Sequence, residues 1–210
     1  MEALIACAGL IFVAAITPGP NNFAVLRIAV ARGLHATLPA VGGILVGSIA
    51  MLALGQMGLA ALSAAHSEVR IGVVVCGAAY LVWLGLALVW HSFSTTPTSA
   101  RSERNAPDGA LALFAFQFAN PKSWTLALTV STAIPPADEG AGWYATTAAL
   151  IALFIAIPFV CLIAWAAFGR LVAPMLRNAR ARARFDRAMG AVLAASALAL
   201  LIQQSPAEGL

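Results

Sequence analysis

Apolar residues follow one another along this chain in long runs that short polar segments separate. Six of the runs are long enough to cross the hydrocarbon core of a bilayer as a helix, which takes about 20 residues. They cover Ala3–Leu26, Thr37–Leu62, Val69–Trp90, Ala110–Ala133, Trp143–Phe168 and Phe185–Gln203. The pattern therefore predicts an all-α membrane protein with six transmembrane helices.

Composition supports a membrane protein. Hydrophobic residues make up 61% of the chain and charged residues 10%, whereas about a quarter of an ordinary soluble domain is charged. A soluble fold of this length would need more polar surface than the sequence supplies. The first apolar run is interpreted as a membrane span and not as a cleaved signal peptide, because it starts with Glu2 and has no lysine or arginine ahead of it.

A polar segment rich in serine, threonine, proline and charge divides the chain into two halves. We expect one membrane domain that consists of a first three-helix repeat (1–90), a cytoplasmic linker (91–109) and a second three-helix repeat (110–210). Three spans per half is an odd number, so the second half enters the membrane from the opposite side. This is the topology of an inverted repeat, which many secondary transporters share.

The basic residues predict the orientation. Three segments that lie on one side in the six-span arrangement carry nearly all of them: Arg27, Arg32, Arg101, Arg104, Arg170, Arg177, Arg180, Arg182, Arg184 and Arg187. The positive-inside rule places these segments in the cytoplasm and both termini on the periplasmic side of a bacterial inner membrane. Membrane topology also accounts for the net charge of +4, so we expect contact with lipid and none with nucleic acid.

The first span contains a cluster of helix-breaking and polar residues: Thr17, Pro18, Gly19, Pro20, Asn21 and Asn22. Each proline lacks a backbone donor and clashes with the carbonyl group four residues back. In a membrane, such a break is tolerated only against protein or a water-filled cavity. Where the helix resumes, its free N–H groups suit an anion. The cluster therefore predicts a substrate site, although a kink that serves packing alone is the alternative.

The fourth span contains a second proline motif, formed by Gln117, Asn120, Pro121 and Lys122. Lys122 is the one ionisable side chain well inside a predicted span, where a charge costs at least about 2.5 kcal/mol. It could hold a substrate carboxylate or titrate as part of proton coupling. The alternative is a lysine whose stem lies in lipid and whose ammonium group reaches the interface.

Other features predict packing. Gly43 and Gly47 form a G-x-x-x-G motif, which lets helices approach closely, and Pro158 could kink the fifth span. The three cysteines and three histidines show no metal-ligand spacing, so we expect neither a metal nor a cofactor.

The Thr-Pro-Gly-Pro-Asn-Asn motif, followed by Ala31-Arg32-Gly33, resembles the LysE/RhtB family of amino-acid exporters. The resemblance covers the whole chain and includes the Asn-Pro-Lys motif and the segment Phe185–Gly190. It implies an inner-membrane exporter of amino acids or related zwitterionic metabolites, driven by the proton-motive force, and not an enzyme. The family motifs fall on Thr17, Pro18, Gly19, Pro20 and Asn21 in the first span and on Asn120, Pro121 and Lys122 in the fourth.

Other functions fit less well. A small-solute channel of the aquaporin kind also pairs Asn-Pro motifs across inverted halves, but its motifs lie on re-entrant loops late in each half. A thiol–disulfide electron carrier would need a cysteine in the fourth span, which has none. A membrane enzyme would need a motif such as H-E-x-x-H or G-x-S-x-G, and neither occurs. Glycine-rich helix faces would permit a homodimer.

Overall fold

A computed structural model describes residues 2–59, 66–93, 109–132 and 141–202, and this part of the chain contains helices and no strand. The longer helices are α1 (Glu2–Ile16), α2 (Pro20–Arg32), α3 (Leu38–Leu54), α5 (Ser67–His91), α7 (Ala110–Ala119), α8 (Pro121–Thr132), α9 (Ala141–Val172) and α10 (Ala179–Ile202). Short turns η1 (His35–Thr37), η2 (Gly55–Leu59) and η3 (Met175–Arg177) flank some of them. Most of the predicted linker lies outside the described residues.

Two stretches of the described residues, His35–Gly58 and Trp143–Val172, are long and apolar enough to cross a membrane as single helices. A third candidate is the pair α1 and α2, which pass the same test together but are bent by 50° at their break. α7 is apolar but only ten residues long, because Pro121 starts a new helix after it. The all-helical character of the prediction is confirmed, whereas the six-span count stays a prediction.

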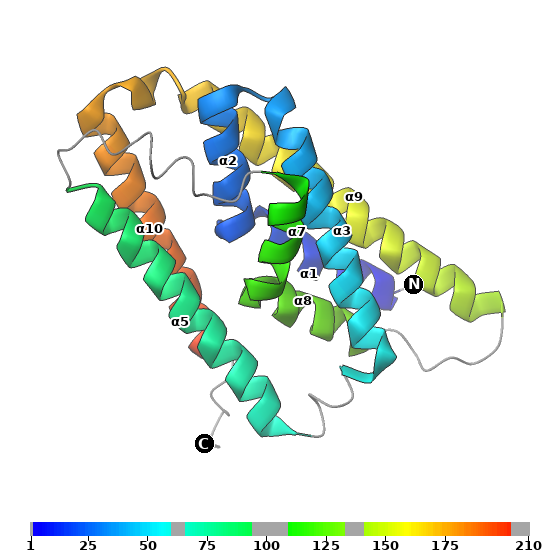
Figure 1. Cartoon of the computed structure of the whole chain (residues 1–210). Coiled ribbons are helices and arrows are strands. Elements are labelled where there is room, and N and C mark those ends of the chain that lie inside the picture. The colour runs from blue at the N-terminus through cyan, green and yellow to red at the C-terminus, as the bar shows by residue number, and fades with distance from the viewer. Residues whose placement is uncertain (1, 60–65, 94–108, 133–140, 203–210) are drawn as a thin grey trace.

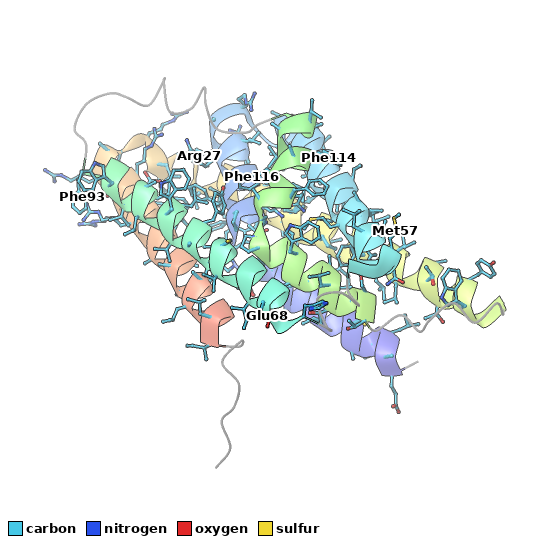
Figure 2. The ribbon with its side chains drawn as sticks, turned by 60° about the horizontal axis from the view of Figure 1, so that its bottom comes forward. Arg27, Met57, Glu68, Phe93, Phe114 and Phe116 are labelled. Atoms are coloured by element: carbon cyan, nitrogen blue, oxygen red, sulfur yellow. The ribbon has the colours of Figure 1, made fainter. Side chains whose placement is uncertain are left out.

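Several helix ends differ from the predicted span ends. α2 continues through Arg32 and α10 begins at Ala179, so basic residues assigned to loops lie on helices. Arginine is a good helix former, and its long stem lets the guanidinium reach away from the apolar part of the helix. The Arg187 guanidinium lies 4.9 Å from the ring centre of Phe93. Figure 2 shows Arg27 and Phe93 toward one end of the bundle and Met57 and Glu68 toward the other.

In the packing of the two halves, helices of one half contact the broken helix pair of the other half. α3 of the first half packs on α7 and α8 of the second, while α9 of the second half packs on α1 and α2 of the first. α5 and α10 pair along their length at one side of the molecule (Figure 1). As a result the two broken helix pairs lie between the α5–α10 pair on one side and α3 and α9 on the other (Figure 1).

Glycines bring these helices into backbone contact. A Cβ atom built on Gly43 of α3 would lie 2.0 Å from the carbonyl oxygen of Ala110 in α7. Cβ atoms built on Gly85 and Gly190 would each lie 2.6 Å from the other residue's carbonyl oxygen, where α5 crosses α10. The packing role predicted for Gly43 is thus confirmed, because any side chain there would force the helices apart.

Candidate functional site

The first break lies between Ile16, the last residue of α1, and Pro20, the first residue of α2. Gly19 caps α2 with an extended backbone (φ −164°, ψ 178°) and no side chain bonds to this helix start. Pro18 and Pro20 supply no N–H, so the carbonyl groups in the last turn of α1 lose donors that a continuous helix would give them.

Side chains from three helices replace those donors. The indole Nε1 of Trp165 in α9 donates to the carbonyl oxygen of Ile16 at 3.1 Å, which is the acceptor that Pro20 cannot serve. The Asn22 amide donates to the carbonyl oxygens of Ala15 at 3.0 Å and Thr17 at 2.8 Å. The Ser196 hydroxyl of α10 shares its proton between the carbonyl oxygens of Val192 at 2.9 Å and Pro18 at 3.4 Å. The tertiary structure therefore stabilises the break, because protein side chains donate to the main-chain carbonyl groups that the prolines leave without donors.

The second break is centred on Asn120, whose backbone is extended between α7 and α8 (φ −92°, ψ 107°). Its side-chain Oδ1 accepts a hydrogen bond of 3.1 Å from the main-chain N–H of Lys122. Asn120 thus caps α8, and Pro121 occupies the first helical position, where a missing N–H costs nothing. The Asn120-Pro121 pair therefore explains why α7 ends and α8 starts at this point.

Lys122 joins the two breaks. Its Nζ donates to the main-chain carbonyl oxygen of Thr17 at 2.8 Å. A Cβ built on Gly19 would lie 3.4 Å from both Cδ and Nζ of the lysine, so the lysine side chain lies against bare backbone. The alternative of a lysine that extends to the membrane interface does not match this position.

A cavity lies between the breaks, with about 60 Å³ of space for the centres of water-sized molecules. Its walls come from both broken helix pairs and from α3 and α9: Ala14, Ala15, Gly19, Pro20, Asn21, Asn22, Ile44, Ser48, Asn120, Lys122, Ser123, Leu126, Phe154, Pro158 and Leu162. Six of the predicted site residues are among these. Thr17, Pro18, Gln117 and Pro121 are not, and they lie directly behind the wall as neighbours or bonding partners of residues that are.

The charge of the cavity is of one sign, positive. Lys122 is the single charged residue among its lining residues. The start of α2, where Asn21 and Asn22 lie, adds the positive end of a helix dipole with no side-chain cap. The Oδ1 atom of Asn21 is buried and has no hydrogen-bond partner. Because buried polar atoms are nearly always paired in folded proteins, this acceptor marks a place where a ligand donor fits.

Behind the lining residues Ser48 and Ser123, Gln117 is fully buried and makes three hydrogen bonds. Its Nε2 donates to the carbonyl oxygen of Ile44 at 3.2 Å and to the hydroxyl of Ser48 at 2.6 Å. Its Oε1 accepts from the hydroxyl of Ser123 at 3.3 Å. Gln117 therefore orients the two serines that line the cavity.

Sequence reasoning missed Ser48, Ser123, Trp165 and Ser196. A serine within an apolar run is a weak signal, although Ser123 directly follows Lys122. Trp165 and Ser196 reach the first break from 149 and 178 residues away. No local pattern reports such contacts.

Known proteins resemble this chain over most of its length. A family described as "LysE type translocator" matches residues 12–204 of the chain. Among curated relatives, a cysteine/O-acetylserine efflux protein of Escherichia coli O157:H7 is 29% identical over 168 residues, covering 79% of this chain and 82% of the relative. Proteins of the same description from Salmonella choleraesuis (strain SC-B67) and Salmonella typhimurium (strain LT2) are 30% identical with the same coverage. No solved structure matches the chain.

Proposed function

The chain belongs to the LysE type translocator family of amino-acid exporters, and on this basis we propose that it exports small neutral amino acids, cysteine and O-acetylserine among them. Transport would be secondary and driven by the proton-motive force across the bacterial inner membrane. The named relatives are efflux proteins and not enzymes.

One observation carries this proposal: the cavity between the two helix breaks places Lys122 and the uncapped start of α2 on the same small space. An ammonium group and free main-chain N–H groups together suit a carboxylate. The unpaired Oδ1 of Asn21 suits a donor such as an α-ammonium group. A zwitterion of small volume matches this combination better than a dication or a sugar does.

The exchanged packing of the halves supports an inverted repeat. Exchanging α1 with α7, α2 with α8, α3 with α9 and α5 with α10 turns the contact of α3 with α7 into that of α9 with α1. The same exchange turns α2 with α9 into α8 with α3, and it leaves the pairs α5–α10 and α3–α9 unchanged. Such symmetry suits alternating access around a fixed central site.

The packing also supports the proposed orientation. The ends of α2 and α5 and the starts of α7 and α10 lie toward the same side of the bundle, at the top of Figure 1. These ends carry the arginine-rich segments, which the positive-inside rule places in the cytoplasm.

Counterflow in proteoliposomes tests the function. Vesicles loaded with unlabelled cysteine should accumulate radiolabelled cysteine, and a pH gradient should change the rate. A carrier saturates and shows counterflow, whereas the alternative, a small-solute channel, does neither. Flux that is linear in concentration and independent of internal cysteine would overturn the proposal.

A further inference from the structure

The hydroxyl groups of Ser48 and Ser123 on the cavity wall can accept hydrogen bonds but have no free proton to donate. This follows from one fixed point, the main-chain carbonyl oxygen of Ile44, which is an acceptor only. The Gln117 group that faces it at 3.2 Å must therefore be the amide nitrogen. If the amide were rotated by half a turn, two acceptor oxygens would face each other in a buried site.

The amide orientation decides where both hydroxyl protons lie. The second proton of Gln117 Nε2 points to the Ser48 oxygen at 2.6 Å, so Ser48 accepts there and donates its own proton to the Ile44 carbonyl oxygen at 2.8 Å. Gln117 Oε1 then faces Ser123, whose hydroxyl donates to it at 3.3 Å. Lone pairs on both serine oxygens remain for the cavity.

Lys122 and the start of α2 have the opposite character, whereas the unpaired Oδ1 of Asn21 is a further acceptor in the cavity. Lys122 donates to the Thr17 carbonyl oxygen with one of its three protons, and the start of α2 presents N–H groups. Among the lining residues none is acidic. A cationic ligand group therefore finds neutral oxygen acceptors here and no carboxylate.

We propose that the hydroxyl oxygens of Ser48 and Ser123 bind the α-ammonium group of the exported amino acid. Each hydroxyl already donates its proton in a hydrogen bond, Ser48 to the Ile44 carbonyl oxygen and Ser123 to Gln117 Oε1. Ser48 and Ser123 are specificity-determining residues and Gln117 is a positioning residue. The site selects ligands whose α-ammonium group can donate to the two serine oxygens. The inference rests on the proposed function, because it takes the ligand to be a small zwitterion.

Inhibition of cysteine counterflow by two truncated ligands tests the assignment under a reductant. Cysteamine keeps the ammonium group and lacks the carboxylate, whereas mercaptopropionate keeps the carboxylate and lacks the ammonium group. The measured quantity is the concentration of an added unlabelled ligand that halves the counterflow of radiolabelled cysteine. For unlabelled cysteine and for cysteamine, this concentration should rise about tenfold in Ser48→Ala and in Ser123→Ala, as expected for one lost hydrogen bond to a charged group. The value for mercaptopropionate should change less than about twofold.

Two further variants separate binding from structure. Ser123→Thr keeps the hydroxyl and should restore wild-type inhibition by cysteamine. Gln117→Leu frees the Ser123 proton and removes the donor that orients Ser48, so it should weaken cysteamine relative to mercaptopropionate. Ser131→Ala is the matched control, because Ser131 lies on the same helix but bonds to the Leu52 carbonyl oxygen outside the cavity.

The outcomes are distinct. Equal weakening of all three ligands in the alanine variants, or none, would overturn the ammonium site while counterflow by the wild-type protein stood. Absence of wild-type cysteine counterflow would overturn the proposed function and this inference with it.

Discussion

The ammonium group of Lys122 donates a hydrogen bond of 2.8 Å to the main-chain carbonyl oxygen of Thr17, across 105 residues of sequence. The lysine comes from the start of α8 and the carbonyl group from the broken segment before α2. One contact thus connects the two proline breaks, and Asn22 donates to the same oxygen at 2.8 Å. A ligand carboxylate that draws Lys122 away from Thr17 would leave Asn22 to hold that carbonyl group.

Lys122→Met should abolish cysteine counterflow, because methionine keeps much of the stem but has no charge to bind a carboxylate. The protein should still fold, since Asn22 continues to donate to Thr17. Rates of counterflow and monodispersity in detergent check both parts. Lys122→Arg is the charge-preserving comparison, and a wild-type rate in the methionine variant would contradict the proposed role.

Gly43→Ala should destabilise the packing of α3 on α7. The added methyl group would meet the Ala110 carbonyl at 2.0 Å, and overpacking of this kind costs about 1–3 kcal/mol. Thermal unfolding in detergent measures the loss. The neighbouring Gly42→Ala is the matched control, because a Cβ there meets nothing within 4 Å; equal melting temperatures for the two variants would refute the close crossing.

Trp165→Phe should lower stability by about 1 kcal/mol, because it removes the donor to the Ile16 carbonyl oxygen and keeps most of the ring. The same change at Trp83, whose side chain is 63% exposed, serves as the control. Melting temperatures in detergent compare the two. If Trp165→Phe and Trp83→Phe melt alike, the indole donor does not support the break.

The orientation can be tested by cysteine labelling. In a protein without its three native cysteines, Glu68→Cys should react with a membrane-impermeant maleimide added to intact cells whose outer membrane is permeabilised. Arg177→Cys should react only after the inner membrane is opened. Both parent side chains are exposed, so accessibility to the reagent depends on the side of the membrane. Reversed labelling would place both termini in the cytoplasm.

Local chemistry made part of the fold and site predictable. A proline lacks an N–H wherever it occurs, so the sequence located both breaks, at Pro18–Pro20 and at Pro121, and the structure confirms a helix interruption at each. Pro158 shows the limit of the rule, because α9 continues through it. Whether a proline ends a helix depends on the donors and packing around it.

The sequence by itself determined the all-helical character and the two proline breaks, because each follows from composition or from the covalent structure of a residue. Only the tertiary structure decided which groups replace the donors that the prolines lack, and that Gln117 fixes the protons of Ser48 and Ser123. The physical reason is that the apolar runs are alike in composition, so no local pattern shows which helix faces meet. The partners of the breaks come from chain segments that only packing brings together.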